Sequence, residues 1–330
     1  MTQANAAPIG SAPQRRYGPY TGKRIQGPRF VIDQGDPRYP AALLDVERPP
    51  QRLYGIGDPS ALREGLAVIG ARKATPYGKG LCRRFAGEAS RRGLVIISGG
   101  AYGCDAEAHR AALDAGGTTV VVFGGGCDHV YPARHLALFQ EVVDKGGAVL
   151  SEHDWTFPAQ PYTFRARNRL IAGLARATLI VEAGLPSGTF STADDALDMG
   201  REVLVVPGPI TSATSAGTNR LLLQGATPIV DDESFSDALF SIFGILRESP
   251  VAPSESGTAD PLLAALLAEP MRIDQMAAIP GICDGTAFDA LTAATIRLAE
   301  LESAGLIVRY PDGRYGPKGD MRAVSKNAGR

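Results

Sequence analysis

Leu66-Ala67-Val68-Ile69-Gly70 decides the fold, because it is a short, unbroken apolar run that ends at a glycine. A strand that is covered by helices on both faces has this pattern, whereas a strand with one face in water alternates apolar and polar residues. The turn Ala71-Arg72-Lys73-Ala74-Thr75 follows, and residues 77–92 then carry apolar side chains at helical spacing. The stretch predicts a strand, a turn and a helix of an α/β protein.

The same unit recurs through the middle of the chain. Further strands are predicted at residues 94–97, 118–123, 148–150, 177–181, 203–206 and 227–230, with a helix at 105–115. Strands that alternate with helices favour a doubly wound parallel sheet, which binds its ligands at the carboxyl ends of its strands. Clusters of Gly, Ser, Thr or Arg follow nearly all of these strands, so we expect one extended site along a single edge of the sheet.

Composition separates the other parts of the chain. The N-terminal stretch carries arginine and lysine but no acidic residue, and its few apolar residues cannot form a core. Three helical segments and a hairpin near the C-terminus predict a small winged-helix domain. The predicted organisation is a disordered basic arm at 1–28, an extended lead-in packed on the core at 29–58, the α/β domain at 59–246, a linker at 247–259, the winged-helix domain at 260–317 and a basic tail at 318–330.

Charge and composition exclude several classes of protein. The chain has 330 residues and a net charge of −1, so a polyanion must bind at a local basic patch, without help from an overall positive field. The four cysteines and four histidines lack the spacing of a metal site or a disulfide framework. No G-x-G-x-x-G fingerprint follows the first strand, and no apolar run is long enough to span a membrane. We therefore expect a cytoplasmic protein without metal or cofactor.

The first candidate anion contacts follow the strand predicted at 66–70. Gly70 permits a close backbone approach, Arg72 supplies a bidentate donor and Lys73 adds a second positive charge, which together suit a phosphate group. After the next strand, Ser98 and Gly99 begin a glycine-dense turn that can form an anion-binding nest of backbone N–H groups. An ordinary strand-to-helix turn with exposed bases has the same pattern and stays open as the alternative.

The second group of candidates surrounds an arginine cluster. Phe164 precedes Arg167-Asn168-Arg169, which suggests a nucleobase stacked on the phenylalanine and arginines on the sugar–phosphate backbone. Ser187-Gly188-Thr189 opens a helix after a predicted strand, and a helix N-terminus is a phosphate-binding site. In the alternative, Phe164 belongs to the core and the arginines are paired on the surface. Glu182, which lies between these motifs, could be a catalytic acid or base, but no paired carboxylate, nucleophile or metal set stands beside it. It is therefore interpreted as a counter-charge to the arginines.

In chain order, the motifs are Gly70-Ala71-Arg72-Lys73, Ser98-Gly99, Tyr131-Pro132, Ser151-Glu152, Phe164, Arg167-Asn168-Arg169, Glu182-Ala183, Ser187-Gly188-Thr189 and Pro207-Gly208. This ordered set, which covers about residues 36–235, resembles the DNA-processing protein A (DprA, also called Smf) family. Arg165 departs from the pattern, because the family usually has proline at that position.

The resemblance implies an extended Rossmann-like domain that binds single-stranded DNA irrespective of sequence. It also implies that the protein protects incoming DNA, helps to load the RecA recombinase in natural transformation, forms a homodimer through that domain and is not an enzyme. Carried over by position, the DNA contacts would be Gly70, Arg72, Phe164 and Arg167-Asn168-Arg169, with Ser187-Gly188-Thr189 on phosphate.

Two other functions stay open. A nucleotide-processing enzyme of the phosphoribohydrolase type also has a Rossmann core, but its loop carries a catalytic glutamate that is not found after Gly188 here. Alternatively, the winged helix reads duplex DNA and the protein is a regulator. The long predicted helix of that domain offers Arg297 as its only base between residues 286 and 304, which favours a protein contact over binding in a DNA groove.

Overall fold

A computed structural model describes residues 22–245, 260–268, 270–276, 279, 289–310 and 313–317. The chain divides into two units, residues 1–247 and 248–330, and each is described by itself. The part of the predicted arm before residue 22, the linker at 247–259 and the tail at 318–330 lie outside the described residues.

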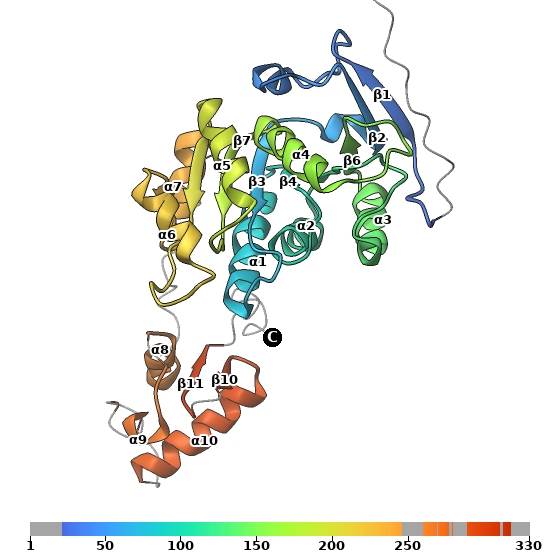
Figure 1. Ribbon diagram of the computed structural model, residues 1–330. Helices are drawn as coiled ribbons and strands as arrows, with labels where there is room; N and C mark the ends of the chain where they lie inside the picture. The colour runs from blue at the N-terminus through green and yellow to red at the C-terminus, as the bar shows by residue number, and fades with distance from the viewer. Residues whose placement is uncertain are drawn as a thin grey trace, which may run out of the picture. The chain divides into compact units, whose positions relative to one another are not determined.

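In the first unit, the seven predicted strands and two strands of the lead-in, β1 and β2, form one sheet, in the order β1-β2-β6-β5-β4-β3-β7-β8-β9 (Figure 1). The strands are β1 (Arg29–Asp33), β2 (Arg52–Gly57), β3 (Gly65–Ile69), β4 (Ile96–Ser98), β5 (Thr119–Val122), β6 (Ala148–Ser151), β7 (Ala175–Ile180), β8 (Glu202–Val205) and β9 (Thr227–Pro228). Neighbours from β6 through to β9 are parallel, whereas β1 with β2 and β2 with β6 are antiparallel. The predicted doubly wound α/β fold is confirmed.

Helices cover both faces of the sheet. They are α1 (Pro76–Arg91), α2 (Cys104–Asp114), α3 (Leu136–Asp144), α4 (Pro161–Leu174), α5 (Thr189–Asp198), α6 (Ala216–Leu223) and α7 (Asp232–Phe243). Leu170 of α4 and Ala193 of α5 pack in one buried cluster, whereas Phe85 of α1 and Phe235 of α7 pack in another. All residues of β3 are buried, which explains why its sequence is apolar throughout.

The sheet reverses its direction of growth at β3. The chain adds β4, β5 and β6 in turn on one side of β3, crosses back through α4, and adds β7, β8 and β9 on the other side. After β3 the chain enters α1 on one face, and after β7 it enters α5 on the opposite face. Two neighbouring parallel strands whose helices separate in this way leave a crevice at their carboxyl ends.

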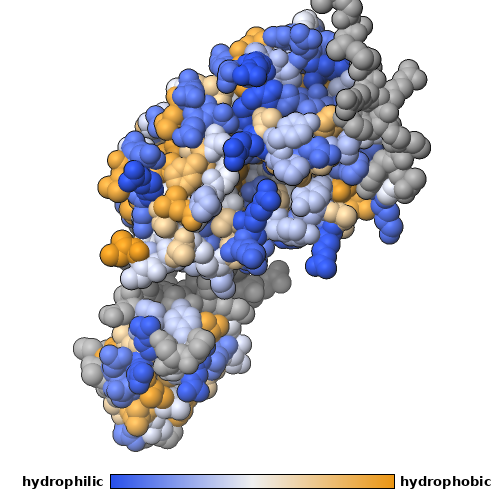
Figure 2. All heavy atoms as spheres, in the orientation of Figure 1, coloured by the Kyte–Doolittle hydropathy of each residue, from blue (hydrophilic) through white to orange (hydrophobic). Residues whose placement is uncertain are grey.

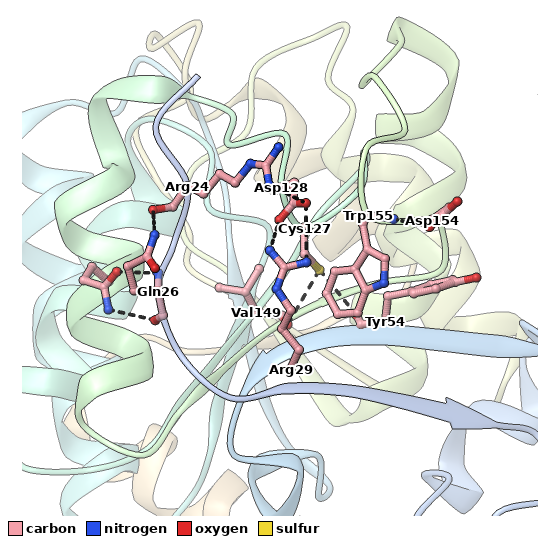
Figure 3. A network of polar contacts seen from close by, with 10 residues as sticks. Arg24, Gln26, Arg29, Tyr54, Cys127, Asp128, Val149, Asp154 and Trp155 are labelled. Atoms are coloured by element: carbon pink, nitrogen blue, oxygen red, sulfur yellow. Dashed lines mark hydrogen bonds and ion pairs between the residues drawn. The ribbon is translucent and has the colours of Figure 1, made fainter. Parts of the chain in front are cut away.

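The lead-in is part of this sheet, because β1 buries every second residue and pairs with β2. Residues 22–28, predicted to belong to the disordered arm, lie against the fold. Ile25 is buried beside α3, and Arg24 and Arg29 both pair with the buried Asp128 (Figure 3). The Arg29 guanidinium also lies 4.5 Å from the centre of the Trp155 ring. Composition placed the end of the arm too late because the residues that hold this segment, Asp128 and Gln140, are distant in the sequence.

The second unit contains α8 (Pro261–Ala268), α9 (Ile273–Met276), α10 (Ala290–Ser303) and an antiparallel pair, β10 (Ile307–Arg309) and β11 (Tyr315–Pro317). Leu262, Met276, Leu298 and Ile307 share its buried core. These elements agree with the predicted winged helix, whose assignment stays a prediction. In the described parts of both units, no helix combines the length and the apolar character that a membrane span requires.

Candidate functional site

A pocket of about 400 Å³ lies at the carboxyl ends of β3, β4 and β7, where the sheet reverses. We call it the rim pocket. Most of the predicted site residues line it, namely Gly70, Arg72, Phe164, Arg167, Asn168, Ser187, Gly188 and Thr189. They come from the turn after β3, from α4 and from the turn between β7 and α5. The prediction of one extended site along a single sheet edge therefore agrees with where these residues lie.

The charge of the rim pocket is predominantly positive. Three guanidinium groups line it, those of Arg72, Arg165 and Arg167, against the single carboxylate of Asp105. Arg72 and Arg165 are exposed, and within the described part of the chain neither forms an ion pair with a carboxylate. Their charge is therefore available to an anion in the pocket.

Arg167 forms a wall of the pocket. Its side chain is buried, and its Nη1 donates to the Gly99 carbonyl at 2.9 Å and to the Val122 carbonyl. Burial lowers the pKa of Arg167 to about 10, with the nearby Asp105 carboxylate acting in the opposite direction. A Cβ on Gly99 would lie 2.6 Å from the guanidinium, so glycine is needed there to seat the arginine. Arg167 thus ties the ends of β4 and β5 to α4.

Phe164 provides an aromatic surface at the mouth of the pocket. Phe164 is partly exposed, with the Arg72 guanidinium 5.9 Å from its ring centre and the centre of the Tyr131 ring 5.1 Å from it. An aromatic ring beside an exposed arginine is a site for stacking a nucleobase whose phosphate the arginine neutralises.

Asn168 positions the turn at the start of α5. Its Nδ2 donates to the Gly188 carbonyl at 3.2 Å and to Ser191 Oγ at 2.9 Å. Within the turn, Ser187 Oγ and Thr189 Oγ1 are 2.7 Å apart, and the Thr189 N–H donates to Ser187 Oγ. The helix begins at Thr189 with Gly188 as its N-cap, so its positive dipole end is presented to the pocket.

Four predicted contacts lie outside the rim pocket, and one of them is Gly99, which seats Arg167. Ser98 is fully buried and its hydroxyl donates to the Val68 carbonyl at 2.7 Å, so it stabilises the strand ends and cannot reach a ligand. Lys73 is exposed but does not line the pocket. Arg169 forms a bidentate pair with Glu152, at 2.7 and 2.6 Å, and donates to the carbonyls of Glu47 and Arg48. Arg169 is thus held by an internal carboxylate, as the alternative prediction for the arginines stated.

The interpretation of Glu182 was wrong. Its carboxylate accepts from the Thr75 backbone N–H at 2.8 Å and from Thr75 Oγ1 at 2.6 Å, and pairs with no arginine among the described residues. It therefore caps the start of α1, where an anionic side chain is favourable. Gly78 lies directly against it, because a Cβ there would be 2.2 Å from the carboxylate. A catalytic acid or base would need this carboxylate free to reach a substrate.

Two charged residues of the pocket lining, Arg165 and Asp105, were missed as contacts. Arg165 was noted only as a departure from a family pattern, although its place next to Phe164 in the arginine cluster was a usable signal. Asp105 accepts the Ala101 N–H at 3.2 Å, and burial raises its pKa while the charge of Arg167 opposes that shift. Asp105 lies in the first turn of α2, whose N-cap is Gly103. Among the described residues, no group of His, Cys, Asp and Glu is suited to hold a metal ion.

Comparison with known proteins addresses the family directly. A family model described as DNA recombination-mediator protein A matches residues 30–240. The chain belongs to this family. Protein Smf of Escherichia coli K12 is 36% identical over 283 residues, which cover 83% of this chain and 74% of that relative. The family resemblance of the motifs is confirmed.

Solved structures of the recombination-mediator protein A family have the same fold. DNA processing protein A from Streptococcus pneumoniae aligns with a TM-score of 0.58 and 33% identity, covering 62% of this chain and 72% of that chain. The protein from Helicobacter pylori, whose structure is described as giving insight into its single-stranded DNA binding mode, aligns with a TM-score of 0.60 and 31% identity. That alignment covers 66% of this chain and 99% of the Helicobacter chain. The Rossmann-like fold predicted for the first unit is therefore that of the family.

Proposed function

We propose that this protein binds single-stranded DNA irrespective of sequence, with the rim pocket as the anchoring site. In this proposal it protects incoming DNA and helps to load the RecA recombinase in natural transformation and recombination. The observation that supports it most is the convergence of Arg72, Arg165 and Phe164 on one pocket beside the N-terminus of α5. A positive groove with an aromatic platform binds single strands without reading their bases.

The contacts divide by chemistry. Arg72, Arg165 and the turn Ser187-Gly188-Thr189 would bind phosphates, and Phe164 would stack on a base. At Gly70, a Cβ would lie 2.6 Å from Cys104 Sγ and 2.9 Å from the Glu182 carbonyl oxygen. Glycine is therefore needed there for close packing against Cys104 and Glu182, and Gly70 also lines the rim pocket. Arg167 and Asn168 would hold these groups in place, whereas Ser98, Lys73, Gly99 and Arg169 act at most indirectly.

The proposed protein is a homodimer joined through the Rossmann-like unit. Ile210, Leu223 and Val230 are strongly exposed apolar residues in the β8–α6 loop, at the end of α6 and just after the edge strand β9. Hydrophobic residues gather over the side of the unit that carries α5 and α6 (Figure 2). Exposed apolar residues in such numbers favour a protein contact.

The proposal includes no catalytic step, because Glu182, the carboxylate considered for one, is occupied by Thr75. Its partners, DNA and RecA, place the protein in the cytoplasm. Duplex reading by the second unit is not favoured, since Arg297 of α10 already pairs with Asp260 and Glu300.

Fluorescence anisotropy with single-stranded and duplex oligonucleotides of several sequences, over a salt series, tests the binding. We expect preference for single strands, little dependence on sequence and a steep loss of affinity with salt. Equal affinity for duplexes, or strong sequence dependence, would contradict the proposal. RecA loading is tested by the rate of RecA-dependent strand exchange on DNA that is first coated with a single-strand-binding protein, with and without this protein.

A further inference from the structure

A second, smaller hollow adjoins the rim pocket. Its volume is about 20 Å³, and it shares Arg72, Phe164 and Arg167 with the rim pocket. The residues that belong to it alone include Tyr102 and Tyr131, which are 43% and 50% exposed. We call it the tyrosine notch. It has room for about one water molecule and is too small to enclose a nucleobase, so a base must lie over it, on the tyrosine rings.

Both tyrosines are supported from inside the fold. The Tyr102 ring contacts His135 edge to face, with ring centres 4.8 Å apart, and His135 Nδ1 is 3.0 Å from the Gly100 carbonyl oxygen. The Tyr131 ring packs against Phe164 at 5.1 Å and an interplanar angle of 50°. These contacts restrict the rings while leaving about half of each side chain in solvent. Ordering them on binding therefore costs little conformational entropy.

The notch continues the line of the rim pocket along the sheet edge. Ser187 follows β7, Arg72 follows β3, Tyr102 follows β4 and Tyr131 follows β5, in the spatial order of those strands. Three spacings between neighbouring strands of about 4.8 Å make a path of roughly 14 Å. A polynucleotide anchored between α5 and Arg72 that continues past Phe164 would reach the notch.

We propose that Tyr102 and Tyr131 form an additional stacking subsite, which receives the nucleobase next to the one on Phe164. This inference rests on the proposed function and extends its binding site toward β5. The arguments for a nucleobase as the occupant are the continuity with the rim pocket and the shared guanidinium of Arg72, which can neutralise the phosphate between the two bases. Aromatic stacking accepts any base, in keeping with binding irrespective of sequence.

Single-stranded oligonucleotides in which one abasic position is moved along the strand test the subsite. With the wild-type protein, abasic sites at two adjacent positions should weaken binding, one for Phe164 and one for the notch. Tyr102→Ala should weaken binding to intact DNA by about tenfold, a typical effect for one stacked base, and should abolish the penalty at one of the two positions. Tyr102→Phe should restore both the affinity for intact DNA and the penalty at that abasic position. The salt dependence of binding should be unchanged in both variants, because neither loses a charge.

Tyr77→Ala is the matched control, since Tyr77 is 54% exposed on α1 and lines neither hollow. Tyr131→Ala repeats the test if Tyr102→Ala lowers the melting temperature. The subsite is refuted if Tyr102→Ala and Tyr131→Ala bind within about twofold of wild type, a negligible free-energy difference. A loss that leaves both abasic penalties intact also refutes it. Failure of the wild-type protein to bind single strands would instead refute the proposed function.

Discussion

Arg72 and Arg169 should respond in opposite ways to substitution by alanine. Arg72 is exposed, lines the rim pocket and approaches Phe164 at 5.9 Å. Loss of a charge-assisted hydrogen bond to phosphate costs about 1.5–3 kcal/mol of binding free energy, which weakens affinity by roughly tenfold or more. Loss of one phosphate contact should also reduce the slope of log affinity against log salt by about 0.7. Stability should change by less than about 0.5 kcal/mol, as at other exposed positions.

Arg169→Ala should instead lower stability. Its side chain is 18% exposed, and that of its partner Glu152 is 15% exposed. A pair at this depth lies between the surface case of about 0–1 kcal/mol and the buried case of about 3–5 kcal/mol. We therefore expect a loss of about 1–3 kcal/mol in the free energy of unfolding, with the salt slope of DNA binding unchanged.

The two variants are compared by anisotropy from about 50 to 200 mM salt, a range over which phosphate contacts are resolved, and by urea unfolding. Glu152→Ala serves as a control, because it breaks the same pair from the other side and should give a similar loss of stability. If Arg72→Ala keeps the wild-type slope, or if Arg169→Ala reduces it as much, the assignment of the two arginines is refuted.

Three other predictions concern stability and positioning. Burial lowers the pKa of His109 to about 3, so below its ordinary value of about 6.5 only the unfolded chain takes up this proton. As the pH falls from roughly 6.5 to 3, the free energy of unfolding of the wild type should decrease by up to about 1.4 kcal/mol per pH unit. Urea unfolding over this pH range should show a smaller decrease for His109→Gln, and an equal decrease in the two proteins would refute this. Gly103→Ala forces a φ of 77° and puts a Cβ 2.2 Å from the Ala71 carbonyl oxygen, so it should cost more than about 2 kcal/mol. Gly93→Ala, with φ 83° but open space, should cost about 1 kcal/mol by thermal unfolding, and equal costs would contradict the steric argument. Asn168→Ala removes the hydrogen bonds to Gly188 and Ser191, so the affinity for DNA should fall. The slope of log affinity against log salt should stay constant because no charge is lost, and a reduced slope would contradict a purely positioning role for Asn168.

The strands and the turns that follow them were accessible from local sequence. Val68 and its neighbours form an apolar run too short for a buried helix, and Gly70 ends it. The length of the run and the glycine after it therefore both indicated a buried strand. The boundary of the arm at residue 28 was not accessible, because Arg24 and Arg29 are ordered by Asp128, about a hundred residues away. The composition of the N-terminal stretch describes that stretch alone, so it cannot show a partner that lies elsewhere in the sequence.

The roles of the three arginines of α4 also could not be predicted from local sequence. Arg165, Arg167 and Arg169 look equivalent in the sequence, but each step of two residues turns the helix by about 200°. Arg167 consequently points inward to Gly99 and Val122, whereas Arg165 lines the pocket. Arg169 lies about one turn after Arg165 and pairs with Glu152.

By itself, the sequence determined that this chain forms a doubly wound α/β unit with anion-type turns at its strand ends, since hydrophobic periodicity and glycine placement are local properties. The tertiary structure decided which turns meet, because the order β5-β4-β3-β7 arises from pairing between distant segments. It also decided which cations stay free, because an arginine binds a ligand only where no internal carboxylate or carbonyl group has already satisfied it.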